Sequence, residues 1–268
     1  MTDATPFVWN VDRVLIELGP FSIKWYGLLF ATGFLIGYEI IRRIYVLEEK
    51  PEEDLGRLLV YMLVATVVGA RLGEVVFYNP DYYFSHPFEI LKVWKGGLAS
   101  HGGGIGIGIG LYLYSRSRDA QPYLWLLDRI AIPTALAGAL IRLGNFFNSE
   151  IIGDPTDVPW AVVFSRVDSL PRHPAQLYES VAYVLIFAVL YSIYRRRGRS
   201  VPDGLLLGLF FLMVFSARFF IEYVKAQQAA YILPVPLSVG QLLSIPAILL
   251  GIGLLIYSSS IKRGDGIR

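Results

Sequence analysis

The sequence predicts an all-α polytopic membrane protein with about seven transmembrane helices. Its 268 residues are 54% hydrophobic and only 17% charged, whereas an average soluble domain is about 25% charged. Its mean hydropathy is +0.51. The apolar residues also gather in stretches of about 20 residues, the length that crosses a hydrocarbon core about 30 Å thick. A soluble core of this length could not bury so much apolar surface, so composition alone favours the membrane class.

Seven stretches are apolar enough and long enough to be predicted as membrane-spanning helices. They lie at about 21–43, 55–78, 98–115, 122–143, 175–194, 203–224 and 238–261. The third is the least regular of them because it is crowded with glycines. The first 20 residues lack the basic and apolar regions of a secretory signal, so we interpret them as an external segment that leads into the first helix.

Basic residues set the predicted orientation of the chain. Lys and Arg concentrate after the first, third, fifth and seventh stretches, as in the run at 195–197, and are fewer in the other loops. The positive-inside rule therefore predicts the N-terminus outside and the C-terminus in the cytoplasm. We interpret residues 1–268 as a single integral membrane domain. The polar, proline-containing segment 144–174, between the fourth and fifth helices, is predicted to be an external functional loop.

Composition also argues against several classes of function. The net charge of +2 comes without a basic cluster on a soluble face, which argues against binding of nucleic acid. The chain has no cysteine, which excludes disulfides, cysteine-ligated zinc, iron–sulfur centres and a thiol nucleophile on the enzyme. His86, His101 and His173 do not form a metal-binding H-E-x-x-H helix. We therefore predict no metal and no cofactor, and any thiol would have to come from a substrate.

Polar and ionisable side chains inside the predicted spans indicate a functional site. Inserting a charged side chain into the hydrocarbon core costs at least about 2.5–3.5 kcal/mol of free energy, so such a side chain indicates a functional role by default. In the predicted orientation, six such side chains on different helices fall in the outer half of the bilayer: Tyr26, Arg71, His101, Arg142, Glu179 and Arg218. The simplest interpretation is a polar chamber open toward the outer leaflet.

Some of the charges inside the spans have structural alternatives. Arg218 and Glu222 are spaced i, i+4 and could simply neutralise each other, although Arg before Glu is the weaker order for helix stability. Arg71 has a glutamate at i+3, and a supporting role is favoured for it over catalysis. Asp128, next to an arginine, is predicted to brace the inner half of the bundle.

The first motif is Ser100-His101-Gly102-Gly103-Gly104, at the start of the third helix. Glycines allow close approach of a backbone or a lipid headgroup, and free N–H groups at a helix start favour an anion. His101 is a plausible proton acceptor near neutral pH. The same string occurs in hydrolase oxyanion holes, but the G-x-S-x-G elbow of those enzymes is absent. For three later glycines of this helix we predict close helix packing: Gly106, Gly108 and Gly110.

The second motif runs from Arg142 through Asn145, Asn148 and Glu150 to Gly153. The guanidinium group of an arginine can donate two parallel hydrogen bonds to two phosphate oxygens. The side-chain amides can bind hydroxyl groups or cap the helix. A plain loop would explain one Asn and a Gly but hardly the whole set.

The third motif runs from Arg172 to Glu179 and enters the fifth helix. Gln176 and Glu179 are spaced i, i+3 and share a face of that helix. Tyr178 lies between them, and for His173 a capping or interfacial role is favoured over catalysis.

On these motifs the chain resembles the prolipoprotein diacylglyceryl transferase family nearly from end to end. The resemblance is carried by Gly19-Pro20, Trp25-Tyr26-Gly27, Gly69-Ala70-Arg71-Leu72-Gly73, Phe77-Tyr78-Asn79, Gly96-Gly97-Leu98, His101 to Gly104, Arg142 to Gly153, Arg172 to Glu179, Arg218 to Glu222, and Gly240-Gln241 to Pro246. The segment from Arg142 to Gly153 is the family's signature. One departure is Val214, where some members carry a Tyr, so no role of that Tyr is carried over.

The resemblance implies an enzyme of the bacterial cytoplasmic (inner) membrane that performs the first step of lipoprotein maturation. It would transfer the diacylglyceryl group of phosphatidylglycerol to the lipobox cysteine in the signal peptide of a lipoprotein precursor, forming a thioether and releasing glycerol phosphate. Residues at the family's essential positions are Tyr26, His101, Arg142, Asn145, Glu150, Gly153, Arg218 and Glu222. Its partners would be these two substrates and the lipid bilayer.

We predict three groups of site residues. The catalytic group is His101, Arg142 and Arg218; the substrate-binding group is Tyr26, Gly102, Gly103, Gly104, Asn145, Asn148, Glu150, Gly153 and Glu222; the supporting group is Arg71, Asp128, His173, Gln176, Tyr178 and Glu179. Arg142 and Arg218 would clamp the phosphate and stabilise the leaving group. His101 would act as base for the thiol, or it would only bind the headgroup while Arg218 acidifies the thiol.

Three other classes of function explain part of the sequence. A secondary transporter also has buried charges, but it predicts an inverted repeat or a midplane site, and no repeat is visible. An intramembrane hydrolase needs a nucleophile–base pair, and Ser100 beside His101 does not provide facing side chains on a helix. A purely structural membrane protein explains the hydrophobicity but not the clustered arginines.

Overall fold

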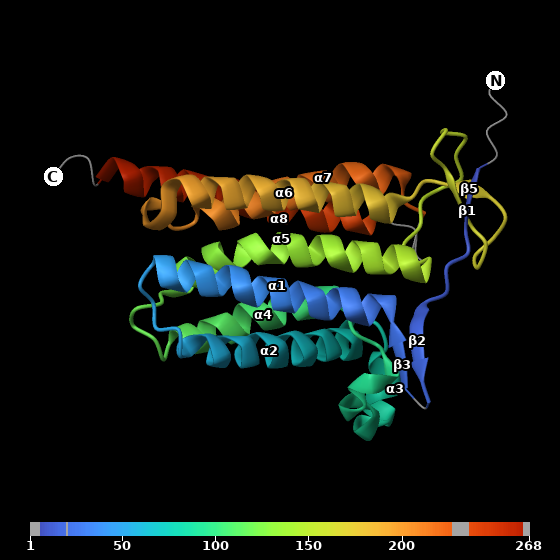
Figure 1. Cartoon of the computed structure of the whole chain (residues 1–268), viewed down its shortest axis with the longest axis horizontal. Coiled ribbons are helices and arrows are strands. Elements are labelled where there is room, and N and C mark those ends of the chain that lie inside the picture. Colours follow the sequence, from blue (N-terminus) through green and yellow to red (C-terminus); the bar gives the residue numbers. More distant parts are fainter. Residues whose placement is uncertain (1–5, 20, 227–235, 265–268) are drawn as a thin grey trace. The chain divides into compact units, whose positions relative to one another are not determined.

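The chain folds mainly into long helices that follow the predicted apolar stretches closely (Figure 1). The structure is a computed structural model that describes residues 6–19, 21–226 and 236–264. Its long helices are α1 (Trp25–Leu47), α2 (Asp54–Phe77), α4 (Ser100–Ser115), α5 (Tyr123–Asn148), α6 (Ala175–Arg197), α7 (Leu205–Ile221) and α8 (Val239–Gly264). The largest difference from prediction is at α5, which extends past the expected end near 143 to Asn148.

Five segments of the described chain are long and apolar enough to cross a membrane. They are Asp54–Phe77, Tyr123–Asn148, Ala175–Ser200, Leu205–Val224 and Val239–Ser260. A polytopic membrane protein is therefore confirmed. Helices α1 and α4 form where they were expected, but they are not among the five. The 16 residues of α4 rise only about 24 Å at 1.5 Å per residue, less than the roughly 30 Å of a hydrocarbon core. A complete crossing by these two helices stays a prediction.

The all-α prediction is wrong in detail, because short strands and short helices accompany the long helices. In the described part of the chain these are β1 (Phe7–Trp9), β2 (Val14–Leu18), β3 (Phe21–Lys24), β4 (Val162–Phe164), β5 (Pro171–Arg172), α3 (Pro80–Ser85), η1 (Pro87–Leu91), η2 (Val93–Lys95), η3 (Gly198–Ser200) and η4 (Glu222–Val224). Strands this short carry no readable alternation in the sequence, and their pairing is decided by distant partners.

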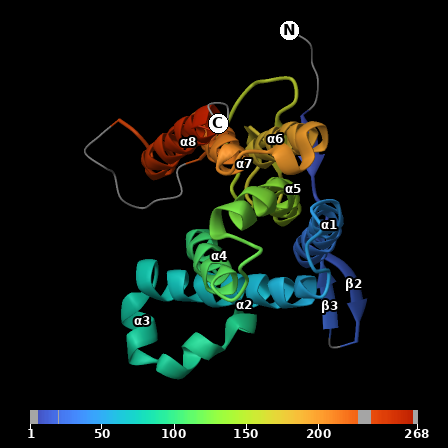
Figure 2. The same cartoon turned by 90° about the vertical axis from the view of Figure 1, so that its left-hand side faces the viewer.

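The chain divides into two compact units, which we describe separately. The first unit comprises Met1–Ile40 and Ile130–Arg268. In it α6, α7 and α8 lie side by side (Figure 1 and Figure 2). Close packing of α7 on α8 depends on Gly208 and Gly251, since a Cβ at Gly251 would lie 2.7 Å from the backbone nitrogen of Leu212.

Two small sheets complete the first unit. One has the strand order β1-β4-β5, with β1 parallel to β4 and β5 antiparallel to β4. The other is the antiparallel pair β2-β3. Phe146, Val162 and Phe164 form a buried cluster under the first sheet, and Trp9 packs on it. This cluster joins the end of α5 to the segment 149–174, so the loop predicted at 144–174 is an ordered, packed structure.

The second unit, Ile41–Arg129, is built around the pair α2 and α4 (Figure 2). Glycines let the two backbones touch: a Cβ at Gly102 would lie 2.2 Å from the carbonyl oxygen of Gly69, and one at Gly106 would lie 2.2 Å from that of Ala65. A Cβ at Gly110 would lie 2.5 Å from the Cβ of Ala65. Helix packing is thereby confirmed for Gly106 and Gly110.

Gly108 contacts a side chain rather than α2. A Cβ at this position would lie at an ordinary 3.6 Å from the hydroxyl oxygen of Tyr123. That hydroxyl donates a 3.0 Å hydrogen bond to the Gly108 carbonyl. For this glycine, close approach of two helix backbones stays a prediction.

Arg71 binds backbone carbonyls in the segment that follows α2. Its guanidinium donates to the carbonyls of Ile90 (2.8 Å), Gly96 (2.7 Å), Gly97 (3.0 Å) and Glu89. The side chain is 4% exposed. A planar guanidinium with several N–H donors suits this task, because it satisfies carbonyls that approach from several directions. The contacts agree with the predicted supporting role.

Asp128 belongs to a second buried polar group of this unit. Its Oδ2 lies 3.7 Å from NH1 of Arg129, and Nε of Arg129 lies 3.0 Å from Oε1 of Glu48. Glu48 also accepts a 2.6 Å hydrogen bond from the indole of Trp125. These contacts tie α1 and α5 together within the unit.

Candidate functional site

The site in the first unit begins where α5 ends, at a turn that folds the chain back over the helix. The amide of Ser149 donates to the carbonyl of Phe146 (3.0 Å), and the amide of Glu150 donates to the carbonyl of Asn145 (2.9 Å). Together with a left-handed φ of 57° at Ser149, this pattern is a Schellman motif. A Gly is usual at the left-handed position, so Ser149 makes this helix end unusual.

The Schellman turn returns the Glu150 carboxylate to the last turn of α5. Oε2 accepts from the side-chain amide of Asn145 and Oε1 from that of Asn148, both at 3.2 Å. Asn145 in turn accepts from NH1 of Arg142 at 3.4 Å. The structure therefore connects the side chains of Arg142, Asn145, Asn148 and Glu150 in the second motif.

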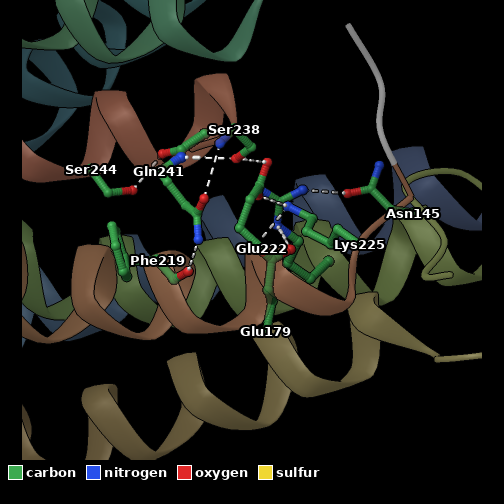
Figure 3. Close-up of polar contacts among 10 residues, drawn as sticks. Asn145, Glu179, Phe219, Glu222, Lys225, Ser238, Gln241 and Ser244 are labelled. Carbon is green, nitrogen blue, oxygen red and sulfur yellow. Dashed lines mark hydrogen bonds and ion pairs between the residues drawn. The ribbon is translucent and has the colours of Figure 1, made fainter. Parts of the chain in front are cut away.

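A chain of ion pairs leads away from Arg142 through Glu179, Lys225 and Glu222, and Figure 3 labels the last three of these residues. Nε of Arg142 lies 2.9 Å from Oε2 of Glu179, which has no exposed surface. Oε1 of Glu179 lies 3.2 Å from Nζ of Lys225, and Lys225 lies 3.2 Å from Oε2 of Glu222. Arg142 thus contacts Glu179 through Nε and Asn145 through NH1.

Ser238 closes this chain at the start of α8. Its hydroxyl donates to Oε1 of Glu222 at 3.1 Å. The same hydroxyl accepts from the amide of Gln241 (3.1 Å), while the Gln241 side chain accepts from the amide of Ser238 (2.9 Å). This reciprocal pair is a capping box, which fixes both the helix start and the hydroxyl.

Tyr26, in the first turn of α1, lies against the second motif. A Cβ added at Gly144 would be 2.8 Å from Cδ2 of Tyr26, so the glycine makes room for the ring. The charges of Glu150 and Arg142 act on the phenol. The structure therefore brings Tyr26 together with the signature segment, as the sequence predicts.

Arg218 lies in the last turn of α7. Within the described residues its buried Nε has no hydrogen-bond partner. The charges of Arg142, Glu179 and Arg218 all act on the buried phenol of Tyr183, so the three ionisable side chains lie in one neighbourhood. The predicted alternative, mutual neutralisation of Arg218 and Glu222, is not favoured, because Glu222 pairs with Lys225 and Ser238 instead.

At Gly153, neighbouring backbone atoms leave no room for a side chain. A Cβ there would lie 2.5 Å from the carbonyl oxygen of His173 and 2.6 Å from that of Val224. Its amide donates to His173 at 2.9 Å, and it forms an antiparallel bridge with Lys225. The backbones of three distant segments thus meet at Gly153.

The third motif supports the second from α6. Gln176, fully buried, donates a 2.6 Å hydrogen bond to the carbonyl of Glu150. One turn later Glu179 holds Arg142, which agrees with the predicted shared face. Nδ1 of His173 lies 3.1 Å from the hydroxyl of Tyr178, which also accepts a 2.7 Å hydrogen bond from the indole of Trp160.

Arg172 makes contacts within segment 149–174. It donates to the carbonyl of Gly153 (3.1 Å) and, through Nε, to Oδ2 of Asp168 (3.0 Å). The Arg172 guanidinium holds the pKa of the Asp168 carboxyl below its usual range, and the Asp168 carboxylate raises the pKa of Arg172.

His101 and its glycines belong to the second unit. His101 is an exposed residue in the first turn of α4. Gly102 packs on α2, and a Cβ at Gly103 would lie 3.6 Å from that of Ala70. Gly104 faces open space within the described residues. Of the three glycines predicted to bind substrate, Gly104 is therefore the one with room beside it.

Sequence reasoning missed Lys225, Ser238 and Tyr183. Lys225 lies just past the predicted span at 203–224, where the sequence pattern predicts a loop. Its i, i+3 spacing from Glu222 is a signal that could have found it. The S-x-x-Q pattern from Ser238 to Gln241 is a capping-box signature in the sequence. Tyr183 carries no such signal.

Comparison with known proteins decides the family. The family model described as "Prolipoprotein diacylglyceryl transferase" matches residues 13–257, which is most of the chain. The chain belongs to the prolipoprotein diacylglyceryl transferase family. It is therefore an enzyme of the transferase class, and the resemblance predicted from the motifs is confirmed.

Members of the prolipoprotein diacylglyceryl transferase family from several bacteria align over almost all of the chain. Proteins named phosphatidylglycerol–prolipoprotein diacylglyceryl transferase are 54% identical in Tolumonas auensis (95% of this chain, 98% of the relative) and 53% identical in Chloroherpeton thalassium (97% and 96%). One from Porphyromonas gingivalis is 44% identical (96% and 96%). Family membership favours the transferase over the transporter, hydrolase and structural interpretations.

Proposed function

We propose that this chain transfers the diacylglyceryl group of phosphatidylglycerol to the lipobox cysteine of a lipoprotein precursor. The bond between the glycerol carbon and the phosphate oxygen breaks, and a carbon–sulfur bond forms at the same carbon. Glycerol phosphate leaves with the bonding electron pair, and the thiol proton passes to a base. The observation that carries the proposal is the Arg142–Asn145–Glu150 cluster, held by Glu179, in a chain whose relatives bear this activity in their names.

Arg142 and Arg218 clamp the phosphate in this proposal. Glu179 pairs with Arg142, with 2.9 Å between Oε2 and Nε, which supports a guanidinium held close to this buried carboxylate. The buried Nε of Arg218 lacks a partner within the described residues, which suits a group that waits for an anion. Two guanidinium charges stabilise the negative charge that develops on the leaving phosphate, because they are aimed there before the reaction begins.

The glycerol part of the lipid binds to the polar side chains at the end of α5. Glu150, whose oxygens accept from Asn145 and Asn148 at 3.2 Å, offers further acceptor positions to hydroxyl groups. Tyr26 contributes a hydroxyl and an apolar ring beside them. Gly153 supports this group through its backbone contacts.

The thiol needs activation, because an unperturbed cysteine with a pKa near about 8.5 is mostly protonated at neutral pH. His101 accepts the proton directly or through water in one version. In the other, His101 binds the headgroup and Arg218 lowers the pKa of the thiol. Replacing His101 with Gln separates them: near-full transfer would overturn the assignment of His101 as base.

The proposed setting is the bacterial cytoplasmic membrane. With the predicted seven spans, external N-terminus and cytoplasmic C-terminus, segment 149–174 would lie on the outer side, where lipid and precursor would meet it. The apolar surfaces of the spanning helices contact the bilayer, the third partner of the enzyme.

A transfer assay tests the proposal. Purified enzyme is incubated with phosphatidylglycerol and a lipobox peptide, and a peptide with Cys→Ser is the control. Thioether-linked diacylglyceryl peptide together with released glycerol phosphate is expected. Fatty-acid release alone would indicate a hydrolase. Solute flux in vesicles without turnover would overturn both enzyme interpretations.

A further inference from the structure

Glu222 lies one helical turn after Arg218, but its carboxylate pairs elsewhere. Oε2 lies 3.2 Å from Nζ of Lys225, and Oε1 accepts from the Ser238 hydroxyl at 3.1 Å. Residues spaced i, i+4 on a helix are neighbours, so an Arg218–Glu222 ion pair is the expected default. Within the described residues, the buried Nε of Arg218 has no hydrogen-bond partner.

Lys225 supplies the charge that Glu222 would otherwise take from Arg218. Its ammonium group lies 3.2 Å from both Glu179 and Glu222, and its side chain is only 6% exposed. An ammonium group has three donors, so it can satisfy both carboxylates together. Glu179, itself fully buried, also pairs with Arg142, and its need for positive charge is thereby met without Arg218.

The backbone of Lys225 is fixed where the signature segment passes. Lys225 forms an antiparallel bridge with Gly153, and the flanking hydrogen bonds join Asp154 to Val224 (2.9 Å) and Ala226 to Ile152 (3.1 Å). The backbone position of Lys225 is therefore defined. When its ammonium group pairs with the two carboxylates, the main remaining entropic cost is the loss of side-chain rotamer freedom.

Gly240 provides the space into which Glu222 is drawn. A Cβ at this position would lie 2.3 Å from Oε1 and 2.5 Å from Cδ of Glu222. The carboxylate thus rests against the first turn of α8, whose N-terminal dipole favours negative charge. The capping box fixes Ser238 at the same helix start.

We propose that Lys225 is a positioning residue which, together with Ser238 and Gly240, holds Glu222 away from Arg218. The Arg218 guanidinium then stays available to an anionic phosphate. This inference rests on the proposed function, in which that phosphate belongs to phosphatidylglycerol.

Three variants of the full-length enzyme test the role of Lys225. Binding of phosphatidylglycerol in mixed micelles is measured without peptide, and KM and kcat are measured with the lipobox peptide. Lys225→Met is expected to weaken lipid binding about tenfold or more, because Glu222 then pairs with Arg218. Lys225→Arg is expected to bind within about threefold of the wild type, since it keeps the charge.

The double variant Lys225→Met/Glu222→Gln separates positioning from general stabilisation. Removing the carboxylate frees Arg218 again, so the double variant is expected to bind phosphatidylglycerol more tightly than Lys225→Met alone. A double variant that binds no better, or a Lys225→Met enzyme that binds like the wild type, overturns the proposal. Lys92→Met is the matched control, because Lys92 also pairs with a glutamate at i−3 but follows η1 in the other unit. This variant is expected to bind phosphatidylglycerol like the wild type.

Gly240→Ala keeps every charged side chain, so it tests the proposed positioning of Glu222 if Lys225→Met does not fold. Its methyl group displaces the Glu222 carboxylate, so weaker lipid binding is expected, and wild-type binding would overturn the proposal. Failure of the proposed function has a different signature: wild-type enzyme that binds phosphatidylglycerol but transfers nothing to the peptide. The Lys225 inference fails instead when the wild type transfers normally but Lys225→Met, or Gly240→Ala where Lys225→Met does not fold, binds phosphatidylglycerol like the wild type.

Discussion

Nε of Arg142 lies 2.9 Å from Oε2 of Glu179, a carboxylate that has no exposed surface. The pair joins the end of α5 to the first turns of α6, the two helices that flank segment 149–174. A buried carboxylate is costly unless it is paired, and Glu179 is paired with Arg142 and with Lys225. Its position suggests that it orients Arg142 and does not react itself.

Glu179→Gln is the first prediction. The amide keeps the shape of the side chain but leaves Arg142 and Lys225 without their shared counter-charge. Because small misplacements of a positioning group cost about a hundredfold in rate, we expect kcat/KM for lipid transfer to fall by about that factor. The transfer assay measures it. Glu52→Gln, which removes an exposed carboxylate that pairs with Arg42 at 3.7 Å, is the control and should retain activity.

Gly153→Ala is the second prediction. The methyl group would meet the backbone oxygens of His173 and Val224 at 2.5 and 2.6 Å, and a backbone gives way less easily than a flexible side chain. We expect a loss of about 1–3 kcal/mol of stability, typical of overpacking, together with reduced transfer. Thermal unfolding in detergent measures the first effect. Gly56→Ala, at a position with open space, should not lower the Tm; an unchanged Tm for both variants would contradict this account of Gly153.

The helices and the motifs were predictable because their signals are local. Apolar stretches of spanning length identified every long helix, and charges inside them identified Arg142, Glu179 and Arg218. The i, i+3 spacing in the third motif correctly placed Gln176 and Glu179 on one face, toward the signature segment.

The remaining features depend on contacts between distant residues. The strand Phe7–Trp9 pairs with Val162–Phe164, and neither is long enough to show an alternating pattern. Ser149 ends α5 in the left-handed conformation that glycine usually provides, so no glycine marks the end of this helix in the sequence. Lys225 looked like a loop charge because its buried partner, Glu179, lies on another helix.

Asp168 gives a prediction about pH. Since Arg172 lowers the pKa of Asp168 in the folded protein, the pair stabilises the loop above the unfolded pKa of the carboxyl, about 3.9. That contribution is lost as the pH falls through the lower folded value. We expect Asp168→Asn to lower the Tm at pH 7 but not at a pH below both values. A Tm difference that stays the same at both pH values would contradict this, and Asp157→Asn, an exposed aspartate of the same loop, is the control.

Arg71→Lys is expected to loosen the segment between α2 and α4. Lysine keeps the charge, but its single ammonium group cannot reach the carbonyls of Glu89, Ile90, Gly96 and Gly97 together. Carbonyls left buried without donors cost about 1–3 kcal/mol each, so we expect a lower Tm and faster proteolysis within residues 80–97. Arg57→Lys, an exposed change in the same helix, should show neither effect. Equal proteolysis rates for the two variants would refute the bracing role.

The orientation of the chain can be tested directly, because the sequence contains no cysteine and any introduced one is unique. Ser169→Cys places a thiol in the exposed outer loop, and Arg199→Cys places one in the basic segment after α6. Because the positive-inside rule predicts opposite sides for them, a membrane-impermeant maleimide added to intact spheroplasts should label Ser169→Cys only. After lysis both should be labelled, which controls for accessibility. Labelling of Arg199→Cys before lysis, with Ser169→Cys protected, would invert the topology and move segment 149–174 to the cytoplasmic side.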